Sequence, residues 1–190
     1  MDVYNLPPSK YPRQSLYRVQ YDESCTKYDV QHGLCARDTL TFYDGTENRL
    51  DKKDFKTAVD NHLHWSSRHS SIFISLFSDQ NHADRWLLRR HDNRNCKDCF
   101  VLEIDPSKLE YVYKAQDLVD ALSIDVYPGA KESVKEEYLV AYRILAEAIV
   151  GRSSLEAIQR RFIRQPRSVP MVDENAASDE LLDMVEKLRL

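Results

Sequence analysis

The chain has 190 residues, which is enough for one domain with a buried core and roughly thirty further residues in tails. Hydrophobic residues make up 42% and charged residues 31% of the chain, as in soluble globular proteins. The net charge of −4 and the pI near 5.9 argue against a nucleic-acid-binding protein that relies on a broad basic surface. No apolar stretch approaches a membrane span and no signal-peptide core begins the chain, so we expect an intracellular protein.

Residues 1–13 are rich in proline and polar side chains, and we predict that they form an N-terminal arm. A single domain is then expected over residues 14–165. Its first strand is predicted at Leu16 to Tyr21, where alternate side chains would point to opposite faces of a sheet. Residues 22–50 contain two glycines among many polar groups, and we predict long loops with little regular structure there.

The next elements follow from helical spacing and from β-propensity. Apolar side chains recur at helical spacing over residues 51–64, which predicts a helix. The β-branched and aromatic run over residues 71–77 predicts a buried strand. Ser78 and Asp79 are natural N-caps, so a second helix is expected to begin directly after them.

Shorter elements complete the chain. The alternating side chains of residues 100–104 predict a strand, which ends at Asp105-Pro106. Another short strand is predicted over residues 111–113. A short helix is expected over residues 115–122. Residues 166–190 read as a polar linker and a C-terminal amphipathic helix, which we expect to pack back on the domain.

Glycine occurs only four times, and none of the four lies in a G-x-G-x-x-G or G-x-x-x-x-G-K pattern. The dinucleotide fingerprint and the P-loop are therefore excluded. The G-x-S-x-G pattern is also absent, which removes the commonest signature of a serine hydrolase. A nucleotide bound by this chain would have to be held by side chains and strand edges.

The four cysteines leave metal binding open but do not favour it. Cys96 and Cys99 have the spacing of a zinc knuckle, whereas Cys25 and Cys35 lie farther apart. Histidines near the middle of the chain add further candidate ligands. Because a structural zinc site normally shows two tight pairs, we expect no metal and free thiols in a reducing compartment.

Three short segments each place one polar side chain beside residues suited to a buried strand. They are Leu16-Tyr17-Arg18-Val19, Ile72-Phe73-Ile74-Ser75-Leu76-Phe77-Ser78 and Glu136-Glu137-Tyr138-Leu139-Val140. Together the segments supply a guanidinium, a hydroxyl and a carboxylate. In this order, and over roughly residues 14–155, the chain resembles the arginine-serine-glutamate class of the ADP-ribosyltransferase superfamily.

The resemblance implies an α+β fold with ADP-ribosyltransferase-like split β-sheets and flanking helices. It also implies that NAD is bound as a substrate and that no metal is needed. Arg18 would hold the phosphates or the adjoining ribose, and Ser75 would shape the nicotinamide pocket and orient the carboxylate. Glu137 would stabilise the cation that forms on the ribose when nicotinamide leaves. The aromatic candidates for stacking on the nicotinamide or the adenine are Tyr17, Phe73 and Trp65.

Residues 132–150 admit two interpretations. Their apolar side chains recur at helical spacing, which predicts an amphipathic helix that begins near Lys131. The resemblance instead implies a strand over residues 137–144, followed by a turn over residues 145–151. We expect the strand, because residues 138–144 and 146–151 fit the superfamily's pattern of an apolar strand, a small turn and a segment that ends in glycine. In the helical interpretation Glu137 would lie on a solvated helix face and could not act as a catalyst.

Some residues depart from the superfamily pattern. Leu76 and Phe77 stand where hydroxyl residues are common. Lys135 occupies the position two before the glutamate, where Gln or Glu often decides the acceptor, so transfer to protein arginine is in doubt. The motif residues also have structural alternatives, since Arg18 could form an ion pair with Glu103 or Asp105.

The sequence thus predicts an enzyme that cleaves the nicotinamide–ribose bond of NAD. ADP-ribose would pass to a protein, to another acceptor or to water. The alternative is a catalytically inactive ADP-ribosyltransferase-like fold that acts as a protein-interaction module. A further alternative is a structural domain, helical over residues 132–150, with no relation to NAD. For the enzyme and for the interaction module we expect an unidentified protein as acceptor or binding partner. We do not expect binding to a membrane or to a nucleic acid.

Overall fold

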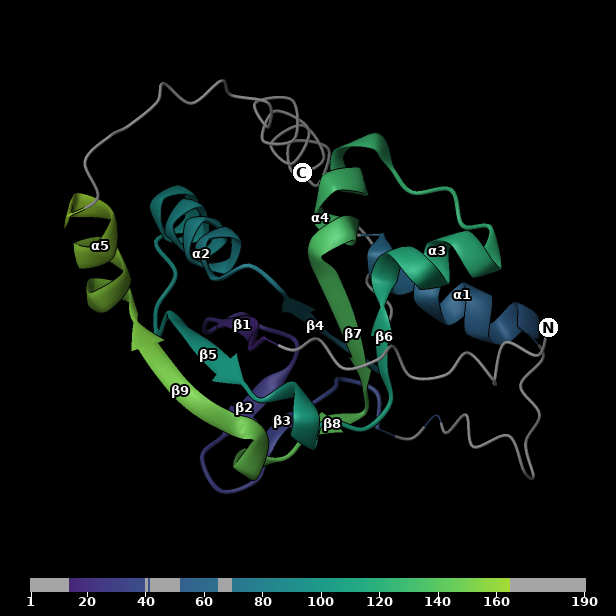
Figure 1. Ribbon diagram of the computed structural model, residues 1–190, viewed down its shortest axis with the longest axis horizontal. Coiled ribbons are helices and arrows are strands. Elements are labelled where there is room, and N and C mark those ends of the chain that lie inside the picture. The colour runs from purple at the N-terminus through teal and green to yellow at the C-terminus, as the bar shows by residue number, and fades with distance from the viewer. Residues whose placement is uncertain (1–13, 40, 42–51, 65–69, 165–190) are drawn as a thin grey trace.

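The computed structural model describes residues 14–39, 41, 52–64 and 70–164. Two antiparallel sheets and five α-helices make up this part of the chain, which therefore has a mixed α+β fold as predicted. Figure 1 shows the strands of the larger sheet at the centre, with helices outside them and the smaller sheet below. The expected arm over residues 1–13 and the expected linker and helix over residues 166–190 lie outside the described residues.

The larger sheet has six strands in the order β6-β7-β4-β1-β5-β9. Pairing is extensive between β1 and β5 and between β4 and β7, with five residue pairs in each. Between β1 and β4 only Tyr17 and Phe77 are paired, so the sheet opens at its centre beyond this point. The strands are β1 Leu16–Gln20, β4 Phe73–Phe77, β5 Phe100–Ile104, β6 Val112–Lys114, β7 Glu137–Ala141 and β9 Ile149–Ser154.

The smaller sheet joins β2 Lys27–Asp29, β3 Gly33–Cys35 and β8 Arg143–Ile144. The prediction of long loops with little regular structure over residues 22–50 overlooked β2 and β3. Each strand has three residues and lies among polar groups, so its β-propensity gives a weak signal. The two strands pair with each other as a local hairpin, and β8, from the far end of the domain, pairs with β3.

Helices lie on two sides of the opening between β1 and β4 (Figure 1). On one side, α3 Ala115–Leu122 and α4 Lys131–Glu136 pack near β7, and α1 Lys52–Leu63 shares their hydrophobic core. On the other side, α2 Gln80–Arg94 packs on β1 and β5, and α5 Leu155–Arg164 contacts both α2 and β9. The side chains between the elements form three hydrophobic clusters.

Most predicted elements are confirmed, with small differences at their ends. The helix over residues 51–64, the strands at β1, β4, β5 and β6, and the short helix at α3 all form. The N-cap of α2 is Asp79, whose side chain accepts a hydrogen bond from the backbone N–H of Asn81. Ser78, the other candidate cap, bonds instead to Glu136, with 2.5 Å between its Oγ and the carboxylate Oε2.

Residues 132–150 combine the two interpretations. A helix does begin at Lys131, but it ends at Glu136, and β7 begins at the next residue. β7 is paired with β4 along its whole length and with β6 over residues 138–140, so sheet pairing outweighs the helical periodicity of its side chains. The expected turn over residues 145–151 is a short 3-10 helix, Ala146–Ala148, that leads directly into β9.

Gly33 carries a backbone constraint that predicts a large loss of stability on substitution. Its φ is +89°, and a Cβ at this position would lie 2.0 Å from the carbonyl oxygen of Ile144. We expect Gly33→Ala to lower the free energy of unfolding by about 2 kcal/mol or more, as measured by urea denaturation. The matched control is Gly151→Ala, where the new Cβ would meet the flexible end of Glu103 at 3.0 Å. Equal losses in the two variants would contradict this account.

Candidate functional site at the opening of the sheet

The three motif residues come from three neighbouring strands. Arg18 lies on β1, Ser75 on β4 and Glu137 on β7. On β4 and β7, Phe77 pairs with Glu137 and Ser75 pairs with Leu139, so Ser75 and Glu137 are diagonal neighbours on one face. Diagonal neighbours on an antiparallel pair are within reach of each other. From this position the Ser75 hydroxyl acts on Glu137 and lowers the pKa of its carboxyl.

The Arg18 guanidinium lies where β1 and β4 separate. Its Nη1 donates a hydrogen bond to the backbone carbonyl of Ser75 at 2.9 Å. Its Nε–H is buried and has no hydrogen-bond partner within the described residues. Burial lowers the pKa of Arg18, and the nearby Glu137 carboxylate acts in the opposite direction. One face of the guanidinium is thus anchored while another donor is left for a ligand.

Glu137 is one of the few charged residues in the interior, with 6% of its surface exposed. Burial raises its pKa to about 7, while the hydrogen bond from Ser75 and the charge of Arg18 act to lower it. Without these two neighbours, the cost of burying the charge would keep the carboxyl protonated. The carboxylate is therefore in balance between its two forms near neutral pH.

His62 on α1 completes the site, and sequence reasoning missed this role. Its Nε2 lies 2.8 Å from Ser75 Oγ and its Nδ1 lies 2.7 Å from Ser71 Oγ. Burial, followed by the positive charge of Arg18, lowers the pKa of His62 to about 4, so the ring is neutral. In the sequence His62 reads as part of the apolar stripe of a helix. One signal could have indicated this role: His62 lies on the apolar face of a helix that precedes the strand with the motif serine.

The aromatic candidates are placed differently from one another. Phe73 is buried in the core, with its ring edge-on to Phe55 at 6.0 Å and to His62 at 5.6 Å between centroids. Tyr17 is half-buried and lies opposite Phe77, on the same face of the sheet as Ser75 and Glu137. Trp65 lies outside the described residues.

The acidic residues that could have bound Arg18 are bonded elsewhere. Glu103 Oε1 accepts a hydrogen bond from Ser15 Oγ at 2.7 Å. The Asp105 carboxylate accepts from the backbone N–H and the hydroxyl of Ser107. Arg18 therefore bonds across the opening of the sheet toward Ser75.

The helix before Glu137 holds the two preceding polar residues away from it. Lys135 binds Glu132 on the same helix, with Nζ 2.6 Å from the carboxylate Oε1. Glu136 binds Ser78 through both its side chain and its backbone carbonyl. Lys135 is more than half exposed, so the position that often decides the acceptor presents an ion pair to solvent.

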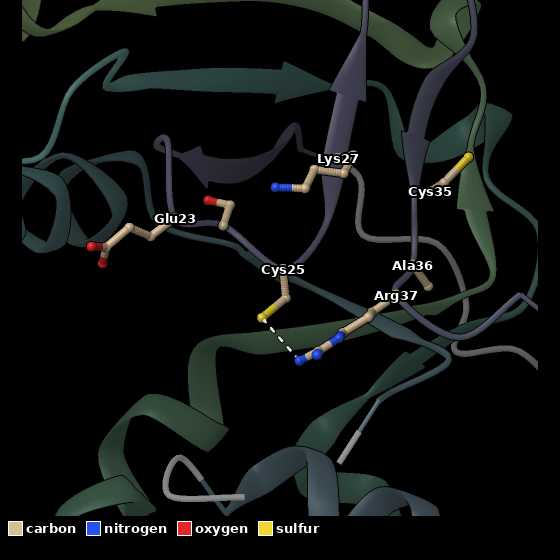
Figure 2. A pocket seen from close by; sticks show the side chains of 7 residues that line it. Glu23, Cys25, Lys27, Cys35, Ala36 and Arg37 are labelled. Atoms are coloured by element: carbon tan, nitrogen blue, oxygen red, sulfur yellow. Dashed lines mark hydrogen bonds between the residues drawn. The ribbon is translucent and has the colours of Figure 1, made fainter. Parts of the chain in front are cut away.

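A pocket of about 480 Å³ lies next to the smaller sheet and is shown in Figure 2. Lys27 and Arg37 bring two positive charges to it, and the Arg37 side chain reaches toward the Cys25 thiol, with 3.9 Å between Nη1 and Sγ. Cys25 also acts on the pKa of Arg18, which it raises. The lining residues are Glu23, Ser24, Cys25, Lys27, Cys35, Ala36 and Arg37.

The cysteines do not gather into one cluster. Cys96 and Cys99 are buried in the hydrophobic cluster beneath α2, whereas Cys25 and Cys35 are exposed. Burial raises the pKa of Cys99 to about 11, which keeps this thiol protonated. Within the described ranges no three His, Cys, Asp or Glu side chains come together as metal ligands would. Nor does that part of the chain contain a helix with the length and apolar character that crossing a bilayer requires.

Comparison with known proteins places the chain in a family. A family model described as "Domain of unknown function (DUF7587)" matches residues 11–158. The chain belongs to this family. The matched region of the DUF7587 family contains Arg18, His62, Ser75 and Glu137, and so the whole of the site.

Other comparisons give less. No curated protein matches the chain. Among solved structures, EcPltA is similar over 73% of this chain and 74% of its own. The sequence identity between the two chains is 11%, and the TM-score is 0.48.

Proposed function

We propose that this protein binds NAD at the opening between β1 and β4, cleaves the nicotinamide–ribose bond and transfers ADP-ribose to an acceptor. The observation that carries this proposal is the buried Glu137 carboxylate, hydrogen-bonded to Ser75 and lying near the Arg18 guanidinium. Together the three residues supply a carboxylate for a cationic ribose and a guanidinium for phosphate oxygens. They are the residues that carry the resemblance to the ADP-ribosyltransferase superfamily.

Glu137 stabilises the transition state. As the bond to nicotinamide breaks, positive charge builds on the ribose, and an ionised carboxylate at its 2′-hydroxyl favours that charge. Nicotinamide leaves as a neutral amine, so the leaving group needs no strong acid. Burial strengthens the interaction because little water screens the carboxylate.

Ser75 and His62 keep this carboxylate in place. The Ser75 hydroxyl bonds to Glu137 and to His62 Nε2, and so its position is defined from two sides. His62 is in turn bonded to Ser71. A neutral ring is suited to this role because it adds no second positive charge next to Arg18. We assign both as positioning residues.

Arg18 and the adjoining pocket account for the rest of NAD. The guanidinium would bind the phosphates or the adjoining ribose through the donors that Ser75 does not occupy. Lys27 and Arg37 would face the remaining negative charge of the adenosine diphosphate half. Among the described residues that line the pocket, the carboxylate is that of Glu23, which lies 3.6 Å from Arg90 and is thus partly neutralised.

The acceptor is a protein side chain, another nucleophile or water. The ion pair of Lys135 with Glu132 replaces the carboxylate or amide that recognises arginine in the superfamily. We therefore propose an acceptor other than protein arginine. A second candidate function is a protein-interaction module that keeps the fold without catalysis. It is favoured by the same ion pair and by Leu76 and Phe77 in place of hydroxyl residues.

Two measurements on one protein sample separate these functions. NAD at one hundred times its dissociation constant should stabilise the fold by roughly 2.7 kcal/mol, and the sample should release nicotinamide when incubated with NAD and cell lysate. Arg18→Lys should weaken the stabilisation, because an ammonium cannot bind two oxygens as a planar guanidinium does. If NAD does not stabilise the wild type and the wild type releases no nicotinamide, the proposed enzyme is overturned and the interaction module is favoured.

A further inference from the structure

A chain of polar side chains leads from Glu137 toward the surface of the protein. Ser75 is the diagonal neighbour of Glu137 and acts on its pKa, Ser75 Oγ lies 2.8 Å from His62 Nε2, and His62 Nδ1 lies 2.7 Å from Ser71 Oγ. We propose that this chain is a proton relay, in which the tautomer of His62 reports whether Glu137 carries a proton. Its outer residue, Ser71, acts as the exit.

The relay ends in a polar hollow of about 180 Å³. Ser71 is half-buried, and its neighbours Asp54, Thr57 and Ser70 are exposed, so the hollow is open to solvent. The volume is sufficient for several water molecules. The polar residues that line it are Asp38, Thr41, Asp54, Thr57, Asn61 and Ser70.

Two arrangements of the chain differ by one proton passed from end to end, because each hydroxyl has one proton and a neutral imidazole has one N–H. When Glu137 is ionised, Ser75 donates to it, His62 Nε2–H donates to Ser75, and Ser71 donates to Nδ1. In the relay, the proton of a protonated Glu137 faces Ser75 and every bond is reversed: Glu137 donates to Ser75, Ser75 to Nε2, and Nδ1–H to Ser71. The Ser71 proton then points into the hollow.

The two arrangements are the start and the end of one proton transfer. From the protonated arrangement, Glu137 passes its proton to Ser75, and Ser75 passes its own to His62 Nε2. Nδ1 then gives its proton to Ser71, and Ser71 gives its own to water in the hollow. One proton leaves Glu137, one appears in solvent, and the imidazole is neutral before and after. No oxidant or further reactant is required.

The proton comes from the proposed transfer of ADP-ribose, and the inference rests on the proposed function for this source of the proton alone. Transfer of ADP-ribose from NAD⁺ to an acceptor H–X forms the ribose–X bond, breaks the ribose–nicotinamide bond and releases one proton. Nicotinamide leaves as a neutral, weakly basic ring, so Glu137 is the base within reach of the acceptor. Glu137 must lose that proton before the next turnover, and the relay removes it.

Few charged groups interfere with the relay. Arg18 on β1 is the charge that acts on both Glu137 and His62. Glu136 on α4 is bonded to Ser78. On α1, Asp60 is paired with His64, and Asp54 lies at the hollow. Asp38 also lies at the hollow, where its carboxylate accepts hydrogen bonds from Thr41.

The test is the tautomer of His62, measured by nitrogen NMR on protein labelled with ¹⁵N-histidine, with the signal assigned by its loss in His62→Gln. We expect Nε2 to carry the proton above the pKa of Glu137 and Nδ1 to carry it below, while the ring stays neutral. In Glu137→Gln this switch should disappear. Ser71→Ala should hold one tautomer through the titration, and Ser71→Thr, which keeps the hydroxyl, should restore the switch.

The outcomes separate the relay from the proposed function, because the NMR experiment needs no NAD. A single tautomer in the wild type across the titration of Glu137 would overturn the relay, even if nicotinamide is released. A switch that Ser71→Ala leaves unchanged would also overturn it. A switch without nicotinamide release would support the relay and remove the proposed enzyme.

Discussion

Glu137→Gln is expected to lower nicotinamide release about a thousandfold while NAD binding persists. The amide has nearly the shape of the carboxylate but no negative charge, so it cannot stabilise the cation that forms on the ribose. Because the substitution also removes a buried charge, the variant should be at least as stable as the wild type at pH 8. Chromatographic measurement of nicotinamide, together with urea denaturation of the same samples, tests both statements.

Glu136→Gln is the matched control. Glu136 precedes Glu137 directly, is exposed and bonds to Ser78. Its amide variant should release nicotinamide at nearly the rate of the wild type. If both variants lose activity equally, or if Glu137→Gln retains it, Glu137 is not the residue that stabilises the transition state.

The second large effect is a pair of opposite pH dependences in stability. Glu137 has a pKa of about 7 in the folded protein, against 4.5 for an ordinary glutamate, so the folded state holds its proton more tightly than the unfolded state. This contribution is fully present below pH 4.5 and is lost as the pH rises to about 7. His62 has a pKa of about 4 against 6.5, so its contribution is present above pH 6.5 and is lost as the pH falls to about 4.

Each group changes the free energy of unfolding by about 3 kcal/mol over its own pH range. The two changes have opposite sign, so they largely cancel in the wild type. Glu137→Gln should therefore gain stability relative to the wild type as the pH rises from 4.5 to 7. His62→Gln should gain stability relative to the wild type as the pH falls from 6.5 to 4, apart from a constant loss of hydrogen bonds.

Urea denaturation at a series of pH values checks this prediction. Other titrating carboxylates are present in all three proteins, so they cancel when each variant is compared with the wild type. Parallel curves for the two variants would show that Glu137 and His62 are not the buried, oppositely shifted pair described above.

The fold was largely predictable from local patterns, and its exceptions have a common cause. Strands such as β4 and β5 and the helix α3 have enough residues for their periodicity to be read. The segments that escaped prediction gain partners from distant parts of the chain. β8 adds a third strand to the hairpin of β2 and β3, and the helical pattern around Glu137 gives way to pairing with β4 and β6.

The chemical groups of the site could be identified in the sequence: Arg18, Ser75 and Glu137 each interrupt a segment suited to a buried strand, in the order of the superfamily that the chain resembles. Their geometry depends on tertiary structure. The register of β4 on β7 makes Ser75 the diagonal neighbour of Glu137, and the packing of α1 brings His62 to Ser75. Packing likewise places Phe73 in the core. Burial then sets the pKa values, because desolvation depends on every element around a side chain and is not encoded in its neighbours along the chain.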